Sequence, residues 1–99
     1  MRALIVCFRD ELVGFDKPQI EVNENSAIRN FAYALTHNDY LTEHAKDYSL
    51  WLIGEFDNEK GTILYDDKKT YPIKLVDGSS IVNGIVAKGD SNDKKTKWN

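Results

Sequence analysis

Two patterns of apolar residues predict the first strands of a sheet. In residues 2–8 both alternating sets of side chains are apolar. This is typical of a central strand that is covered on both faces, or that carries a helix on one face and a partner on the other. Residues 9–17 are mostly polar and include Gly14, so we expect a turn or loop there. Residues 18–22 alternate with a period of two behind a leading proline, which predicts a strand start or an edge strand.

A helical period replaces the strand period in residues 26–35. Asn23 or Asn25 can cap this helix by accepting a backbone N–H, and Glu24 suits the positive end of the helix dipole. We expect the helix to end in the polar run 36–39 and to dock on the sheet, because three turns cannot bury themselves. The apolar face, at positions i, i+3, i+4 and i+7, consists of Ile28, Phe31, Ala32 and Leu35.

The stretch 47–65 predicts a β-hairpin. Residues 50–53 form a short apolar run among aromatic and β-branched neighbours, as strands prefer. The loop 57–61 is rich in turn formers and ends at Gly61, which can adopt a positive φ and restart the ladder. Residues 62–65 then form the return strand.

Other segments complete the sheet and connect it. Residues 40–46 form a short connector with room for one helical turn. Residues 70–76 predict a further strand, and Pro72, which has no N–H to donate, favours an edge position. After a turn signal, we expect residues 80–82 to form a last short strand.

These elements predict one small α+β domain. With 99 residues and 41% hydrophobic content, the chain has material for one core. We expect residues 1–86 to form a four- to five-stranded, mostly antiparallel sheet with one principal helix on one face. Residues 87–99 carry no pattern, and we expect them to be a disordered, basic C-terminal tail.

Charge and cysteine content narrow the functional classes. The net charge of −3 argues against a generally basic nucleic-acid binder, although residues 1–84 carry −5 and residues 85–99 carry +2. Cys7 is the single cysteine and lies in an apolar run, so we expect a buried thiol in a reducing compartment. No apolar run is long enough for a membrane span or fits a signal peptide, and we therefore expect a cytosolic protein.

Residue types that carry catalysis or bind metals are sparse. His37 and His44 would need further zinc ligands, of which only Cys7 remains. The carboxylates near the hairpin ends lack the spacing of a calcium loop. The sequence contains no nucleophile motif and no phosphate-binding glycine loop. We therefore expect a protein that is not an enzyme, with no cofactor, no metal site and no catalytic residue.

The tail contains the first candidate for a nucleic-acid contact. Lys94, Lys95 and Lys97 can neutralise phosphates, and Trp98 can stack on an unpaired base. A solvated terminus explains the same composition equally well.

The sheet contains the second candidate. Trp51, Tyr65 and Tyr71 share one face if the strands pair in register, and single-strand binders use such platforms. The alternative is that these residues are ordinary core aromatics of the strands.

A combination of short motifs resembles a known family. Residues 54–57 read Gly-Glu-Phe-Asp and are followed by a polar turn and Gly61, while Asn23 leads into a helix with Arg29 and Phe31. This resembles the small nonstructural protein of gokushovirus-type microviruses, which are phages with single-stranded DNA genomes. The resemblance covers roughly residues 2–65. It implies an accessory role in phage DNA replication, when duplex copying gives way to single-strand synthesis and packaging, and it brings no binding residues to carry over.

Two functional hypotheses follow. The first is a non-enzymatic phage accessory protein in the host cytoplasm that binds single-stranded DNA or a viral or host replication protein. The second is a protein–protein interaction module or homo-oligomeric adaptor without nucleic-acid binding. The acidic body, the two apolar faces of the first strand and the edges near Pro18 and Pro72 favour the second.

Overall fold

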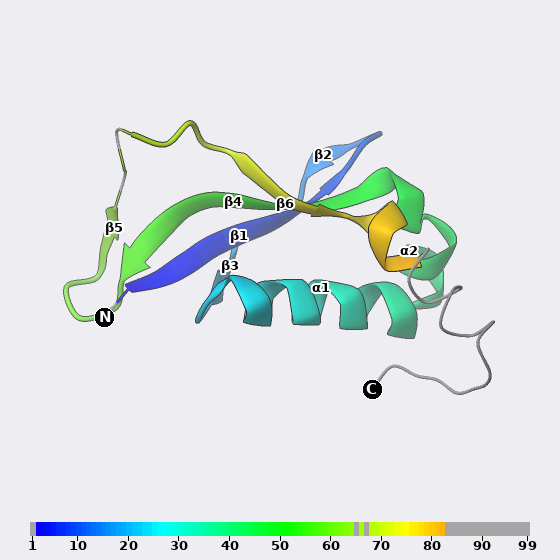
Figure 1. Ribbon diagram of the computed structural model, residues 1–99, viewed down its shortest axis with the longest axis horizontal. Coiled ribbons are helices and arrows are strands. Elements are labelled where there is room, and N and C mark those ends of the chain that lie inside the picture. Colours follow the sequence, from blue (N-terminus) through cyan, green and yellow to red (C-terminus); the bar gives the residue numbers. More distant parts are fainter. Residues whose placement is uncertain (1, 65, 67, 83–99) are drawn as a thin grey trace.

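The computed structural model describes residues 2–64, 66 and 68–82 and has two layers. One layer is a six-stranded antiparallel sheet, and the other is helix α1 (Glu24–His37), which packs on one face of the sheet (Figure 1). The predicted class, a single small α+β domain with one principal helix, is therefore confirmed. The predicted domain end at residue 86 and the tail 87–99 lie outside the described residues. Across the described ranges, no helix is both long and apolar enough to cross a bilayer.

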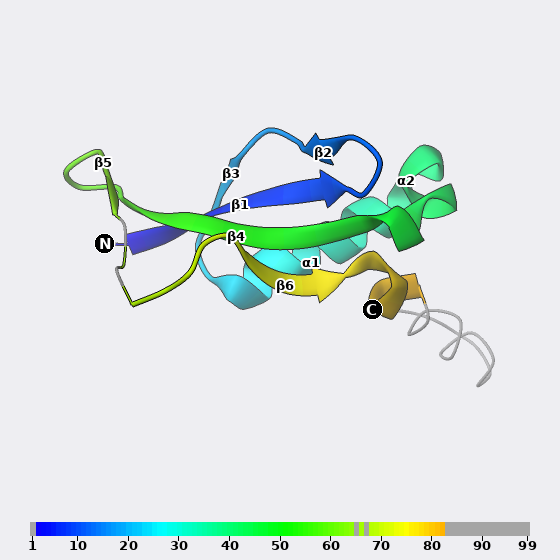
Figure 2. The same ribbon diagram turned by 90° about the horizontal axis from the view of Figure 1, so that it is seen from above.

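Two long strands form the centre of the sheet. β1 (Arg2–Asp10) and β4 (Tyr48–Asp57) pair antiparallel from end to end, with one bulge. Four short strands border this pair, two along β1 and two along β4, as the view from above shows (Figure 2). The border strands are β2 (Gly14–Phe15) and β3 (Gln19–Glu21) beside β1, and β5 (Thr62–Leu64) and β6 (Ile73–Asp77) beside β4.

Helix α1 starts at the first of the two predicted caps. The side chain of Asn23, in extended backbone conformation, accepts a hydrogen bond of 2.8 Å from the backbone N–H of Ser26. The helix is longer at both ends than predicted, because Glu24 occupies its first turn and His37 its last. Its buried residues are Ala27, Phe31, Ala32 and Leu35.

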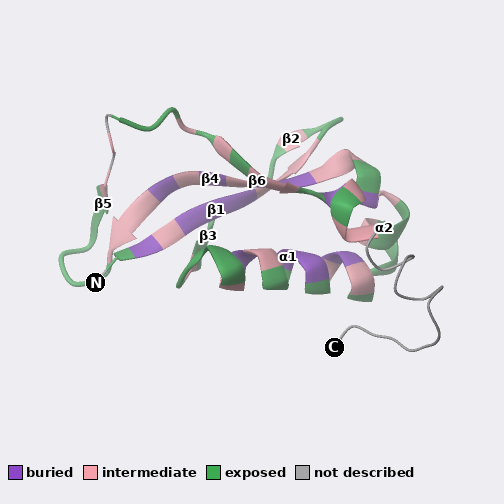
Figure 3. Cartoon of the chain, viewed as in Figure 1, coloured by how far each residue is buried: buried purple, intermediate pink, exposed green. Residues whose placement is uncertain are grey.

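The main core lies between α1 and the two long strands. Figure 3 shows that buried residues concentrate where these three elements meet. Phe31 is fully buried and meets the ring of Phe8 edge to face, with centroids 5.0 Å apart. The buried members of this core are Val6, Ala27, Phe31, Leu35, Ala45, Leu50 and Leu52.

The connector before β4 contains more helix than predicted. α2 (Asp39–Glu43) is capped by Asn38, whose side chain accepts from the backbone N–H of Leu41 at 3.1 Å. A 3₁₀ turn, η1 (Ala45–Asp47), follows and leads directly into β4. A hydrogen bond of 2.7 Å from the Glu11 N–H to the Asp47 carbonyl joins this turn to the end of β1.

The hairpin between β4 and β5 forms as predicted. Asp57 ends β4, and its side chain accepts from the backbone N–H groups of Glu59 and Lys60 at 3.0 and 3.2 Å. These bonds stabilise the carboxylate and lower the pKa of Asp57 below its ordinary value. Gly61 closes the loop with a φ of 70°, a conformation that favours glycine.

Two local predictions are wrong. The expected loop 9–17 contains β2, so the sheet has six strands instead of four to five. Residues 78–82 are helical, although we expected a strand at 80–82. The reason is that Ser49, one residue into β4, already pairs with Asp77, so β4 offers almost no further backbone to a longer strand.

Gly78 lets the chain after β6 approach the backbone of the η1 turn closely, and this generates a stability prediction. A Cβ atom at this position would lie 1.9 Å from the Ala45 carbonyl oxygen, whereas one at Gly54 would meet Ile5 at an ordinary 3.7 Å. We expect Gly78→Ala to lower the free energy of unfolding by about 1–3 kcal/mol through overpacking. The control Gly54→Ala should stay within about 1 kcal/mol of wild type. Urea unfolding followed by circular dichroism measures both, and equal stabilities would contradict the prediction.

Candidate nucleic-acid interface

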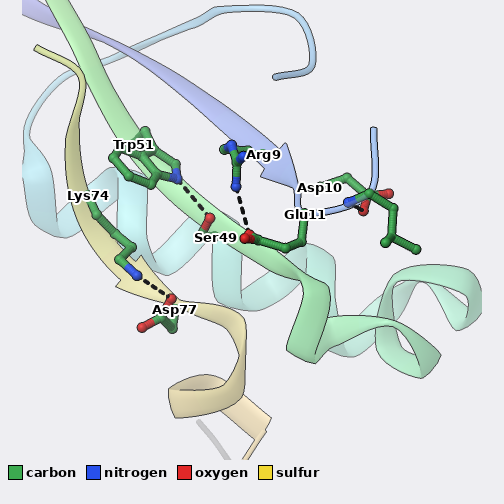
Figure 4. A network of polar contacts seen from close by, with 8 residues as sticks. Arg9, Asp10, Glu11, Ser49, Trp51, Lys74 and Asp77 are labelled. Carbon is green, nitrogen blue, oxygen red and sulfur yellow. Dashed lines mark hydrogen bonds and ion pairs between the residues drawn. The ribbon is translucent and has the colours of Figure 1, made fainter. Parts of the chain in front are cut away.

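The sheet has a second face, opposite α1, that no described helix covers. Side chains alternate along β1, so Val6 and Phe8 pack with the main core while Cys7 and Arg9 belong to the other face. Figure 4 shows Arg9 in front of the sheet, with α1 behind it. We call this second surface the open face.

Four side chains on the open face form what we call the aromatic–cation cluster. The rings of Phe15 and Trp51 meet edge to face, with centroids 5.9 Å apart and planes at 76°. The guanidinium carbon of Arg9 lies 5.7 Å from the centre of the Phe15 ring. On the other side, Lys74 Nζ lies 5.9 Å from the centre of the Trp51 ring. Each ring thus has a cation within reach of its π electrons.

Strand register brings these four side chains together. Arg9 lies opposite Phe15 across β1 and β2, and Trp51 lies opposite Lys74 across β4 and β6. Cys7 lies opposite Trp51 across β1 and β4, which joins the two halves. The cluster therefore runs across four neighbouring strands, at right angles to their direction.

Polar contacts hold the cluster in place (Figure 4). The indole N–H of Trp51 donates to the hydroxyl oxygen of the buried Ser49 at 2.7 Å, which fixes the orientation of the indole. Lys74 forms an ion pair of 3.0 Å with Asp77. Arg9 forms an ion pair of 2.6 Å with Glu11. The two cations of the cluster are thereby balanced by two carboxylates.

Small apolar side chains form the floor of the open face. Ala3, Ile5 and Cys7 are buried although they lie outside the main core cluster. The thiol of Cys7 donates to the carbonyl oxygen of Asp16 at 3.2 Å, which ties the segment after Phe15 to the sheet. Burial, and secondly the Asp16 carboxylate, raise the pKa of the Cys7 thiol. The predicted role of Cys7 as a buried thiol is confirmed.

The structure separates the aromatic residues that the sequence grouped. Trp51 lies on the open face, but Tyr71 packs against the main core on the side of α1. The predicted shared face of Trp51 and Tyr71 is therefore wrong, because residues 71 and 72 precede β6 and are not in register with Trp51. Five candidate residues lie outside the described residues: Tyr65, Lys94, Lys95, Lys97 and Trp98.

Of the four residues in the aromatic–cation cluster, the sequence predicts only Trp51 as a site residue. Arg9 and Phe15 lie in the segment 9–17 that was expected to be a loop but belong to β1 and β2, and Lys74 is a charged residue of β6. One local signal was available, because a large aromatic residue directly after Gly14 in a polar stretch favours a short strand. Its contact with Trp51 depends on pairing between residues far apart in the sequence.

The aromatic–cation cluster has the chemistry to bind a base and its phosphates. Phe15 is 47% exposed, and the side chain of Lys74 is 46% exposed. Aromatic faces stack on unpaired bases, and cations neutralise phosphates. Among the described residues, no group of three or more His, Cys, Asp and Glu side chains could hold a metal ion.

Fold and surface together define a small single-domain α+β protein with one uncovered sheet face. The family model described as Phage ORF5 protein matches residues 3–81. The chain belongs to this family of small phage proteins, which confirms the phage part of the sequence resemblance. Searches among curated proteins and among solved structures found no match.

The environment of Cys7 generates a prediction of reactivity. Because its thiol is 2% exposed and its pKa is raised, we expect native Cys7 to react with a thiol reagent far more slowly than the urea-unfolded chain does. A colorimetric disulfide reagent at neutral pH measures both rates. Equal rates would show that the floor of the open face is accessible, in conflict with the packing described above.

Proposed function

We propose that this phage protein is a non-enzymatic accessory protein of the microvirus type that binds single-stranded DNA in the host cytoplasm during viral DNA synthesis and packaging. The observation that carries the proposal is the aromatic–cation cluster of Arg9, Phe15, Trp51 and Lys74 on the open face. Its rings suit unpaired bases and its cations suit the adjoining phosphates. Membership in the phage family and the resemblance of residues 2–65 support the viral setting.

Stacking supplies most of the expected affinity. Each base that stacks on an aromatic side chain contributes roughly 1–3 kcal/mol. The cations contribute less, because Arg9 and Lys74 must exchange their carboxylate partners, Glu11 and Asp77, for phosphates. That exchange costs little, since exposed ion pairs contribute only about 0–1 kcal/mol. An acidic protein can therefore bind DNA through its rings without a broad basic surface.

Because stacking contributes more than charge, we expect the protein to prefer single-stranded over duplex DNA. In a duplex the faces of the bases are stacked on one another, so Phe15 and Trp51 would have only the backbone to contact. The net charge of −3 makes a purely electrostatic contact with that backbone unfavourable. A preference for unpaired bases matches a role at the stage when single strands are made.

The C-terminal tail is an additional proposed contact. Lys94, Lys95 and Lys97 would add three cations, and Trp98 a further ring for stacking. This part of the proposal rests on sequence alone, because these residues lie outside the described ranges.

A second candidate function is binding to a viral or host replication protein. The observation that favours it is a concentration of exposed apolar side chains near β2 and β3, which DNA binding on the open face does not require. Leu12 and Val13, for example, are 84% and 83% exposed. Failure of DNA binding in the experiments below would favour this function.

The central prediction concerns the indole of Trp51. Trp51→Leu keeps an apolar side chain over the floor but removes the aromatic face. We expect it to weaken binding of a labelled single-stranded oligonucleotide by roughly 5- to 150-fold, the equivalent of one lost stacking contact. Fluorescence anisotropy at low and moderate salt, beside a duplex of the same sequence, measures the affinities.

The matched control is an exposed aromatic residue on the helical side. Tyr33 lies on α1, is 62% exposed and stacks on His37, so Tyr33→Leu removes a comparable ring away from the open face. We expect this variant to bind like wild type. Equal affinities of wild type, Trp51→Leu and Tyr33→Leu would refute a role of the cluster, and no binding by wild type at low salt would refute DNA binding.

A further prediction separates the cluster from the tail. If Arg9, Lys74 and the three tail lysines all contact phosphates, log affinity should fall with log salt at a slope of about −3.5. Deletion of residues 89–99 should reduce this slope to about −1.4, the value for two contacts. Identical slopes of about −1.4 for both proteins would exclude the tail and leave the cluster as the binding site.

A further inference from the structure

Strand β3 borders the sheet and has one side available for pairing. Within the described residues β3 pairs with β1 alone, and the view from above places β2 and β3 along the outer border of the sheet (Figure 2). A strand in this position presents backbone N–H and C=O groups outward, which can pair with a strand of another chain. Edge strands are commonly protected from such pairing by charged side chains, by proline or by a short length. β3 has three residues and follows Pro18, so only a short ladder can form on its free side.

Exposed apolar side chains lie along the border formed by β2 and β3. Of the eight large hydrophobic residues that are exposed in the described part of the chain, five lie within residues 12–22. Ile20 is 54% exposed in the middle of β3, and Val22 is 57% exposed just after it. Isolated exposed apolar residues are normal, but a concentration on one border indicates a contact surface. Leu12, Val13 and Phe15 lie in β2 and the turn before it, whereas Ile20 and Val22 lie in β3 and directly after it.

The side chains of β3 are divided between the two faces of the sheet. Glu21 faces α1, because its carboxylate accepts from the side-chain amide of Asn30 at 3.0 and 3.1 Å and from the hydroxyl of Ser26 at 3.3 Å. Ile20, one residue away, therefore lies on the open face, opposite Ile5 across the strands. Val22 comes directly after the end of β3.

We propose that the partner of this edge is a second copy of the same chain, bound through antiparallel pairing of the two β3 strands. A twofold axis perpendicular to the sheet, passing beside Ile20, pairs the same edge of both copies. Ile20 then lies opposite Ile20 of the second copy, and Gln19 lies opposite Glu21. Pro18 lies opposite Val22, so the ladder itself is limited to residues 19–21.

The sequence is complementary to itself in this register. The two charged Glu21 side chains face neutral Gln19 amides, so no like charges lie opposite each other. On the open face the two Ile20 side chains meet at the axis, and the apolar residues Pro18 and Val22 flank each short strand. Edge pairing of three residues buries little surface, and we therefore expect a dimer that forms and dissociates with concentration.

The dimer extends the proposed function without depending on it. An axis perpendicular to the sheet keeps both open faces on the same side of the assembly. The aromatic–cation clusters stay uncovered, because Arg9 and Phe15 pair at the far end of β1 from the β3 contact at Leu4–Val6. Two clusters on one surface could hold one strand of DNA with higher avidity than a single cluster.

Cysteine cross-linking tests the register directly. In the proposed pairing the Cα atoms of the two Ile20 residues lie roughly 4.5–5.5 Å apart, within the range that a disulfide spans. The two Val22 residues are offset by four positions, roughly 13 Å, which a disulfide cannot bridge. We expect Ile20→Cys to form a disulfide-linked dimer under mild oxidation, and the equally exposed control Val22→Cys to form several-fold less. The native Cys7 is buried in both variants.

Charged substitutions of Ile20 test the dimer independently of cross-linking. Sedimentation velocity over a concentration series should show a monomer–dimer equilibrium for wild type. Ile20→Lys and Ile20→Glu should each be monomeric, because two like charges would face each other at the axis. Their mixture should dimerise again, whereas Ile63→Lys, a change of an exposed residue on the opposite border, should behave like wild type.

Two outcomes would overturn the dimer. One is a wild type that stays monomeric at all concentrations, together with equal cross-linking of Ile20→Cys and Val22→Cys. The other is a dimer that forms equally well with lysine at position 20, which would place the contact elsewhere. Neither outcome bears on DNA binding, because all of these measurements are made without DNA.

Discussion

The antiparallel pairing of β1 with β4 is the interaction on which the rest of the structure depends. Nine cross-strand pairs hold these two strands together, and every other strand attaches to one of them. The pairing also decides which side chains face α1. A shift by one residue would turn Val6 and Leu50 away from the helix and place Cys7 and Trp51 against it. Between Ile5 and Val6 the register shifts by one residue at a bulge, and the pairing continues on both sides of it.

The same register gives the two faces of the sheet different properties. On the helical face, Phe31 and Leu35 of α1 close over Val6 and Leu50, and all four side chains are less than 2% exposed. On the open face the floor is also buried, although no described helix covers it, and Phe15 and Trp51 of the neighbouring strands lie on this face. These two side chains are large and keep one surface toward solvent. The aromatic–cation cluster is therefore a direct consequence of a sheet that has a helix on one side only.

Local patterns in the sequence were sufficient for the elements that are long. The alternation in residues 2–8, the helical period of residues 26–35 and the turn at Gly61 correspond to β1, α1 and the β4–β5 hairpin. Short elements depend on tertiary contacts that no local pattern contains. β2 consists of two residues held by β1, and the helical residues 78–82 depend on the close approach of Gly78 to Ala45. The candidate site was predictable only for Trp51, because its partners come from three other strands.

The border segment formed by β2 and β3 relates the two proposals to each other. Phe15 points inward across the open face to Trp51, whereas Ile20 lies at the outer edge beside Ile5. β2, which contains Phe15, pairs with the Arg9–Asp10 end of β1, and β3, which contains Ile20, pairs with Leu4–Val6. Four positions along a strand correspond to about 13 Å, so a chain can dimerise through β3 without covering its cluster. Pairing of the edges would also shield Ile20 and Val22 from water, because both apolar side chains are more than half exposed in the single chain.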